Sequence, residues 1–279
     1  MTTHTTLPSD TRLAFIGGGN MASAIMGGLI RQGLAAPQID VVEPYAPQRE
    51  KLATDFPGVR IHEAPVGALA GAHVVVWAVK PQTFRDAALA AAPHTGDALH
   101  LSVAAGIRSD SMANWLGTER IVRAMPNTPA LVGQGMTGLY ARPAATAQDR
   151  ALTEAVVGTT GRFVWLPQEA NLDAVTALSG SGPAYVFYFL EAMRRAGTEM
   201  GLSAETATTL AIGTFTGASH LAQASTEPPE VLRERVTSKG GTTYAALTAM
   251  AHGGVADAFV QAMHAARQRA QELGDEFGG

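Results

Sequence analysis

The stretch from Leu13 to Ala24, LAFIGGGNMASA, decides the fold of this chain. Four apolar residues typical of a strand lead into Gly17-x-Gly19-x-x-Ala22, and apolar residues then continue at helical spacing. Strand, glycine turn and helix in this order form the fingerprint of a dinucleotide-binding unit. Gly17 allows the tight turn, Gly19 lets the backbone approach a pyrophosphate, and Ala22 lets the helix pack close to the strand. The stretch therefore predicts a bound dinucleotide.

Segments typical of strands and helices alternate from Arg12 to Pro167. Because strands separated by helices form parallel sheets covered on both faces, we expect an α/β N-terminal domain with a doubly wound, Rossmann-like parallel sheet. The expected strands are Leu13–Ile16, Ile39–Val42, Val74–Val79, Leu99–Val103, Ile121–Ala124, Met136–Tyr140 and Gly161–Leu166. The expected helices are Met21–Gln32, Ala46–Asp55, Thr83–Ala92 and Ser109–Leu116.

After Pro167 apolar residues recur only at helical spacing, which predicts an all-α C-terminal domain. Its many small residues favour burial against a second subunit, although a monomeric bundle is the alternative. We expect a disordered leader at 1–11, a dinucleotide-binding domain at 12–167, and a helical substrate and dimerisation domain at 168–279. The expected helices here are Asn171–Met200, interrupted at Ser179–Pro183, and Ala204–Gln223, Pro229–Val236, Thr242–Met250 and Val255–Glu272.

Composition excludes several classes of function. The 279 residues carry a net charge of −4, whereas a nucleic-acid partner would require a basic surface. The chain has no cysteine, and its eight histidines lack ligand spacing, so we expect no thiol chemistry and no metal site. No apolar run reaches the roughly 18 residues that span a bilayer, and the polar start MTTHTTLPSD lacks the apolar core of a signal peptide. We therefore expect a cytoplasmic protein without a membrane partner.

The segment Val236–Met250, VTSKGGTTYAALTAM, places two glycines directly before a helical pattern. Gly240 and Gly241 let backbone N–H groups approach a ligand, because no Cβ intervenes. The N–H groups at a helix start have no partner within the helix, and the helix dipole there favours a negative charge. Hydroxyl groups come from Ser238, Thr242 and Thr243. The segment predicts a binding site for a small carboxylate, and the alternative is a plain helix cap by Ser238 or Thr242.

Two further turns follow strands, where ligands of doubly wound sheets bind. Lys80 and Pro81 could line the ribose or the nicotinamide of the cofactor, and the alternative is an ordinary strand exit with a surface lysine. Asn127 lies between two prolines and could hydrogen-bond a nicotinamide carboxamide, and the alternative is a stiff turn.

Glu43 ends the second expected strand, where an acidic residue usually holds the adenosine 2′-hydroxyl. Because a carboxylate would repel a 2′-phosphate, we expect NADH to be used at least as well as NADPH.

Five motifs occur in order along the chain: FIGGGNMASAI, AVKPQ, RAMPNTPA, ALSGSGPAYVF and VTSKGGTTYAAL. Together they resemble the pyrroline-5-carboxylate reductase family over nearly the whole chain. The resemblance implies NAD(P)H-dependent reduction of 1-pyrroline-5-carboxylate to L-proline, the final step of proline biosynthesis. It also implies a homodimer formed through the helical domain, and in some members a decamer of five dimers. Hydride transfer to an already protonated imine would need no strong acid, and Lys239 is the only ionisable residue near the glycine pair.

The resemblance also implies a role for each matching residue. The pyrophosphate would be held by Gly17, Gly19, Asn20, Met21 and Ala22. The nicotinamide half would lie along Ala78, Lys80, Pro81 and Asn127. The substrate carboxylate would be held by Ser238, Gly240, Gly241, Thr242 and Thr243. Thr243 would act at the ring nitrogen or in proton delivery, and with Ser238 it is the expected catalytic residue.

Two positions depart from the family pattern. Many members have proline at the position of Lys239. Many also have an Asn-Arg pair where this chain has Glu43-Pro44, which puts the common preference for NADPH in doubt.

Two alternative functions are compatible with the pattern. A related imine or hydroxy-acid oxidoreductase is one, although a hydroxy-acid enzyme would need a base for which Lys239 is the only candidate. A non-catalytic NAD(P)H sensor is the other, although a sensor has no need of a carboxylate site.

Overall fold

Strand β1 (Leu13–Ile16) is a fully buried interior strand of an eight-stranded sheet in this computed structural model, which describes residues 7–65 and 67–278. The strand order is β3-β2-β1-β4-β5-β6-β7-β8. Neighbours from β3 to β6 are parallel, β7 is antiparallel to β6, and β8 is parallel to β7. This confirms the doubly wound, mostly parallel sheet. The other strands are β2 (Ile39–Val42), β3 (Arg60–His62), β4 (Val74–Trp77), β5 (Leu99–Ser102), β6 (Ile121–Met125), β7 (Gly135–Ala141) and β8 (Gly161–Trp165).

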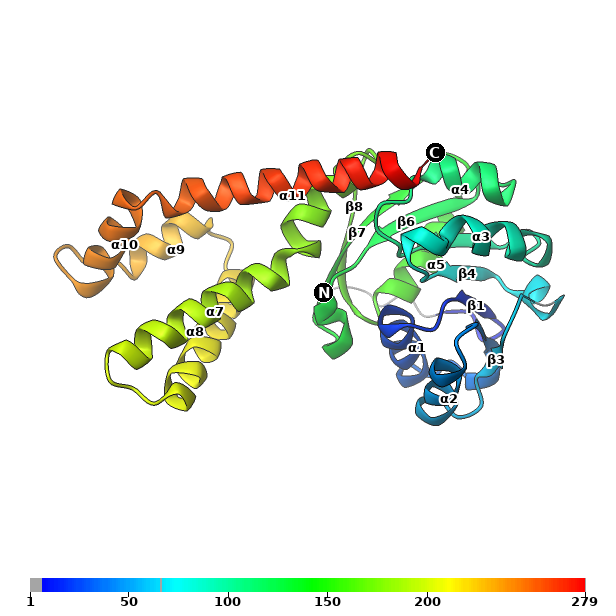
Figure 1. Ribbon diagram of the computed structural model, residues 1–279, viewed down its shortest axis with the longest axis horizontal. Coiled ribbons are helices and arrows are strands. Elements are labelled where there is room, and N and C mark those ends of the chain that lie inside the picture. Colours follow the sequence, from blue (N-terminus) through cyan, green and yellow to red (C-terminus); the bar gives the residue numbers. More distant parts are fainter. Residues whose placement is uncertain (1–6, 66, 279) are drawn as a thin grey trace. The chain divides into compact units, whose positions relative to one another are not determined.

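Helices cover both faces of the sheet, because alternate residues of each central strand point to opposite faces. Leu13 and Phe15 of β1 pack with α1 (Asn20–Arg31), α2 (Ala46–Asp55) and α5 (Ala147–Val157). Ala14 and Ile16 pack with α3 (Pro81–Ala91) and α4 (Ser109–Leu116) on the other face (Figure 1). The two-sided cores explain why the central strands are continuously apolar.

The chain forms two compact units. Unit 1 runs to Ser181 and includes the end of the chain from Ala266, and unit 2 comprises Gly182–Ala265. In unit 1 the short helix α6 (Asn171–Val175) leads into a wide turn at Thr176–Gly180, closed by the Ser181 N–H, which donates to the Thr176 carbonyl at 2.8 Å. The domain boundary at 167/168 stays a prediction.

Among its described residues, unit 2 consists of helices and the turns that join them, without a strand. Its elements are α7 (Gly182–Glu199), α8 (Ala204–Ala224), α9 (Pro229–Arg235), α10 (Thr242–His252) and the first part of α11 (Val255–Phe277). A Cβ at Gly197 of α7 would lie 2.7 Å from the Cβ of Ala207 in α8, so glycine allows the close crossing of these helices. The expected series of helices is confirmed, with the first one divided at the wide turn.

The expected disordered leader lies partly outside the described residues, since 1–6 are not described. From Leu7 onward the chain is held against the sheet. The Gln38 amide donates to the carbonyls of Ser9 and Thr11 at 2.9 and 2.8 Å, and Thr11 is buried.

Candidate cofactor and substrate sites

The glycine turn lies between β1 and β4, where the strand order changes direction. Gly17 has a φ of +94°, and a Cβ there would lie 2.6 Å from the carbonyl oxygen of Ala78. The Gly17 N–H donates to the Val42 carbonyl at 2.8 Å, and the Ala78 N–H donates to the Ile16 carbonyl at 2.8 Å. Only glycine fits this position without strain. The turn therefore occupies the place where doubly wound sheets bind nucleotides.

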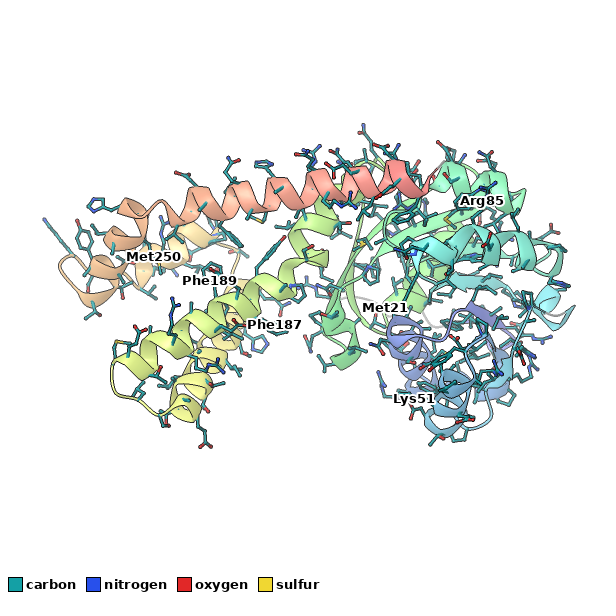
Figure 2. The ribbon with its side chains drawn as sticks, viewed as in Figure 1. Met21, Lys51, Arg85, Phe187, Phe189 and Met250 are labelled. Atoms are coloured by element: carbon teal, nitrogen blue, oxygen red, sulfur yellow. The ribbon has the colours of Figure 1, made fainter. Side chains whose placement is uncertain are left out.

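Helix α1 begins at this turn without a side-chain cap. Gly19 is the N-cap residue, and no described atom lies within 4 Å of the Cβ position at Gly19. Gly19 and Asn20 are exposed, Met21 is half-buried at the start of the helix (Figure 2), and Ala22 is fully buried against the sheet. Open N–H groups at a helix start, with room for close approach, suit a pyrophosphate.

Glu43 is fixed beside the glycine turn. Its Oε2 accepts the Gly18 N–H and its Oε1 accepts the Tyr45 N–H, both at 2.9 Å. Gln48 donates from Nε2 to the Gly18 carbonyl at 2.5 Å. The Gly18 peptide is thus held on both sides by residues that follow β2.

Arg49 holds the same segment from α2, and sequence reasoning singled out neither it nor Gln48. Its Nη1 donates to the carbonyls of Glu43 and Pro44 at 3.0 and 2.7 Å. Its Nη2 pairs with Glu63 at 3.3 Å. The guanidinium of Arg49 is therefore largely engaged within the protein.

Lys80 and Pro81 lie at the carboxyl end of β4, two and three residues beyond Ala78. Lys80 is the exposed N-cap residue of α3, and Pro81 is its first residue. Since Ala78 contacts the Gly17 turn, the structure brings these residues to the same edge of the sheet as the glycines.

Asn127 uses its side-chain amide within the protein. Its Nδ2 donates to the Ser179 carbonyl at 3.0 Å, and its Oδ1 accepts the Met136 N–H at 2.9 Å. The side chain ties the start of β7 to the wide turn before α7, and one N–H of the amide remains for a ligand. Its contact with a nicotinamide stays a prediction.

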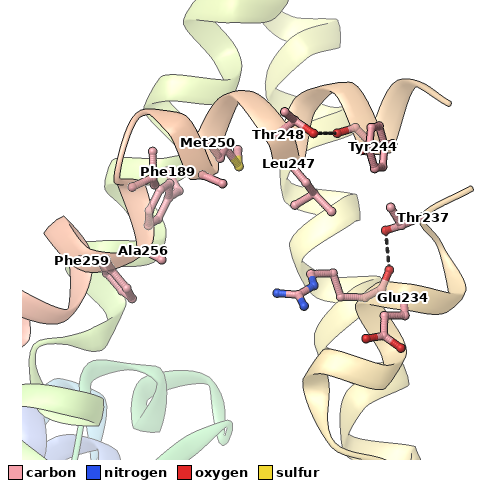
Figure 3. Close-up of a pocket in the computed structure, with 12 residues that line it drawn as sticks. Phe189, Glu234, Thr237, Tyr244, Leu247, Thr248, Met250, Ala256 and Phe259 are labelled. Atoms are coloured by element: carbon pink, nitrogen blue, oxygen red, sulfur yellow. Dashed lines mark hydrogen bonds between the residues drawn. The ribbon is translucent and has the colours of Figure 1, made fainter. Parts of the chain in front are cut away.

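The predicted carboxylate site forms a turn at the start of α10. Gly240 has a φ of +76°, and a Cβ at Gly241 would lie 2.5 Å from the Ser238 Oγ. Gly241 is the N-cap residue, and no side chain caps the helix, so the capping role considered for Ser238 or Thr242 is absent. Within the described chain the hydroxyls of Ser238, Thr242 and Thr243 form no hydrogen bond, unlike Thr248 of the same helix, which donates to the Tyr244 carbonyl at 2.8 Å (Figure 3).

A cavity of about 540 Å³ lies in unit 2 (Figure 3), and its lining includes Thr237 and Tyr244, the residues directly before and after this turn. Its wall is mostly apolar, with Phe189 from α7, Leu247 and Met250 from α10, and Phe259 from α11. Arg233 and Glu234 of α9 also line it, and sequence reasoning singled out neither residue. The periodicity of α9 alone gave no sign that its end lines a cavity.

Among the described residues, no group of three or more His, Cys, Asp or Glu side chains could hold a metal ion. None of the helices in residues 7–65 and 67–278 is long and apolar enough to cross a membrane.

Known proteins resemble this chain along almost its full length. A family model described as pyrroline-5-carboxylate reductase dimerisation matches residues 169–273, and one described as NADP oxidoreductase, coenzyme F420-dependent, matches residues 12–106. Pyrroline-5-carboxylate reductase of Pseudomonas aeruginosa is 45% identical over 97% of this chain and 99% of its own length.

Two solved structures show the same fold. The pyrroline-5-carboxylate reductase of Coxiella burnetii has a TM-score of 0.88 at 35% identity, and the match covers 95% of this chain and 98% of that one. Pyrroline carboxylate reductase of Plasmodium falciparum, with NADP bound, has a TM-score of 0.84 at 25% identity, covering 95% and 99%.

Proposed function

The chain belongs to the pyrroline-5-carboxylate reductase family, and on that premise we propose that it reduces 1-pyrroline-5-carboxylate to L-proline with NAD(P)H, the final step of proline biosynthesis. The observation that supports this most is the turn at Ser238–Thr243. It combines an uncapped helix start with three hydroxyls that form no hydrogen bond within the described chain. Such a turn suits a carboxylate, whereas a protein that only senses NAD(P)H has no use for it.

The cofactor would lie across the glycine turn of unit 1. We propose that the first turn of α1 holds the pyrophosphate through Gly17, Gly19, Asn20, Met21 and Ala22. Glu43 would face the adenosine ribose, and the nicotinamide half would lie along Ala78, Lys80, Pro81 and Asn127. The open space at Gly19 and the tight contact of Gly17 with Ala78 support this placement. When bound, NAD(P)H supplies the hydride.

The substrate would bind at the turn of unit 2. We propose that the N–H groups of Gly240 and Thr242, with the Ser238 hydroxyl, hold the substrate carboxylate. The Gly241 N–H donates to the Ser238 carbonyl at 3.0 Å, so Gly241 contributes by its missing side chain, which leaves room for the ligand. The Thr243 hydroxyl would contact the ring nitrogen or deliver a proton. A protonated imine accepts hydride at carbon and becomes a secondary amine, so the protein needs to orient it and exclude water rather than supply a strong acid.

The test is the initial rate of cofactor oxidation with racemic pyrroline-5-carboxylate, with NADH and NADPH in parallel. Turnover with either cofactor is expected. Absence of turnover with both, in protein that binds the cofactor, would contradict the proposed substrate.

The family model for dimerisation supports a homo-oligomer. We propose a homodimer as the basic assembly, with a decamer of five dimers as the larger form. The exposure of large apolar side chains on the helices of unit 2 supports this, because an isolated chain rarely leaves so many in water. They include Val186, Phe187, Tyr188, Met193, Leu210, Ile212, Leu221, Tyr244, Met250 and Val260. A cytoplasmic location stays a prediction from the sequence.

A further inference from the structure

A charged cavity of about 440 Å³ lies in unit 1. It is formed by the loop after β5, by β6 and α6, and by the end of α11. None of the residues proposed to hold cofactor or substrate lines it. Its polar lining consists of Arg108, Arg123, Glu169, Asp173, Gln271 and Asp275.

Most of these charges are already paired. Arg108 pairs with Asp275 at 2.5 Å, and Arg123 Nη1 pairs with Glu169 Oε1 at 2.6 Å. Glu169 also accepts the N–H and the hydroxyl of Ser109, so its carboxylate is fully used.

Asp173 is the exception among the carboxylates. No described residue donates a hydrogen bond to its side chain, and burial raises its pKa although Arg123, Arg108 and Arg267 act in the opposite direction. The cavity therefore contains one carboxylate that no donor satisfies.

Arg123 supplies the positively charged group in this cavity that could bind an anion. It is only 8% exposed, and among its hydrogen bonds within the described chain only the one from Nη1 to Glu169 involves the guanidinium. A guanidinium has five N–H donors. Among the described residues, every side-chain nitrogen that is fully buried has a hydrogen-bond partner. The remaining N–H donors of Arg123 have no such partner, so they must be accessible to solvent. Arg123 lines the cavity, so a ligand in it would lie beside this guanidinium.

We propose that this cavity binds a small α-amino acid, whose carboxylate pairs with Arg123 and whose ammonium group pairs with Asp173. A zwitterion satisfies both groups at once. A simple anion would leave Asp173 without a donor, and a simple cation would leave the donors of Arg123 unused. The volume lies in the range of small-molecule sites, about 300 to 1,000 Å³. The site is independent of the proposed reaction.

The test is a thermal-shift screen of the full-length protein with each of the twenty proteinogenic L-amino acids in turn. At least one should stabilise the wild type, and Asp173→Asn should need about tenfold more of it, since one charge-assisted bond is lost. Asp86→Asn, which changes an exposed carboxylate on α3, should behave as wild type. The desamino and decarboxy analogues of the active amino acid should have no effect.

The Thr243→Ala variant distinguishes a ligand of the charged cavity from a ligand of the proposed substrate turn. A ligand of the charged cavity should still stabilise that variant, whereas a ligand of the substrate turn should lose its effect there and keep it in Asp173→Asn. Arg123→Lys, which keeps the charge with fewer donors, should also weaken binding. If every amino acid affects wild type and Asp173→Asn equally, the proposal is wrong.

Discussion

The hydroxyl of Thr243 forms no hydrogen bond within the described chain, in contrast to the hydroxyls of Thr208 and Thr214 in α8, and is available to a ligand. Thr208 and Thr214 donate to the carbonyl four residues earlier, at 2.7 and 2.8 Å. We expect Thr243→Ala to lower kcat/KM for the imine by about 10- to 100-fold, the value of one hydrogen bond to a charged group. The dissociation constant of the cofactor, measured by fluorescence titration, should stay the same. Thr208→Ala is the matched control, and equal weakening of cofactor binding would show that Thr243 is wrongly placed.

Glu43 cannot easily turn away from a cofactor, because two backbone N–H groups hold both of its oxygens. Its charge should therefore act against a 2′-phosphate. We expect wild type to use NADH at least as well as NADPH. Glu43→Gln should raise the NADPH to NADH ratio of kcat/KM by about tenfold, as expected for removing one repulsive charge at a partly exposed site. Glu50→Gln, on the exposed side of α2, is the control. An unchanged ratio would mean that Glu43 does not face the ribose.

Asp173 should make stability depend on pH. Its pKa in the folded protein is raised above the ordinary value of 3.8, mainly by burial. Its contribution to stability is therefore fully present below the unfolded pKa and is lost as pH rises through the folded pKa. Asp173→Asn should match wild type in urea unfolding near pH 3 and should be the more stable protein near pH 7. Asp86→Asn should show no such divergence. Equal stability at both pH values would contradict the raised pKa.

At the scale of elements, prediction succeeded where one local pattern fixes the geometry. The run Leu13–Ile16 with its glycine turn specified β1 and the start of α1, because only a strand, a left-handed glycine and a helix satisfy that sequence. The three-residue strand β3 was missed, since it has too few residues for alternation to show. Helix α5 was also missed, although Thr146 and Asp149 form a capping box at its start.

Contacts between distant segments could not be predicted from the sequence. The hydrogen bonds that Asn127 forms with Met136 and Ser179 join segments up to 52 residues apart, and no sequence pattern predicts such bonds. The hydrogen bond from Gln48 to Gly18 and the place of Arg233 and Glu234 in the wall of the cavity of unit 2 are of the same kind. Motifs thus located the two proposed sites, whereas the side chains that support them required the three-dimensional structure.

The start of α1 offers a test of the cofactor site that leaves the fold intact. Gly19 has ordinary extended dihedrals, and a Cβ added there would have no described atom within 4 Å. We expect Gly19→Val to unfold within about 1 kcal/mol of wild type, the usual size of a change at an N-cap. Its affinity for NADH and NADPH should nevertheless be lost, because the side chain would occupy the approach of the pyrophosphate. Retained affinity would place the cofactor elsewhere.

At the scale of the whole molecule, the two units differ in how they bury apolar surface. Unit 1 closes two cores around its sheet, whereas unit 2 leaves large side chains of its helices exposed. Phe187 of α7, labelled in Figure 2, is 59% exposed. Leu89 of α3 in unit 1 is 52% exposed and lies outside the region matched by the dimerisation model. Substitutions at Phe187 and Leu89 therefore compare an expected interface residue with an ordinary exposed apolar residue.

We expect wild type to elute as a dimer or a larger assembly in size-exclusion chromatography with light scattering. Phe187→Asp should shift the protein to smaller species, because a charge buried in an apolar interface without a partner is strongly unfavourable. Leu89→Asp should keep the wild-type mass. If contacts between subunits support the helices that carry the substrate turn, the specific activity of Phe187→Asp should fall in proportion to the fraction of protein that is no longer assembled. A Phe187→Asp protein with the mass of wild type would exclude this face of α7 from the interface.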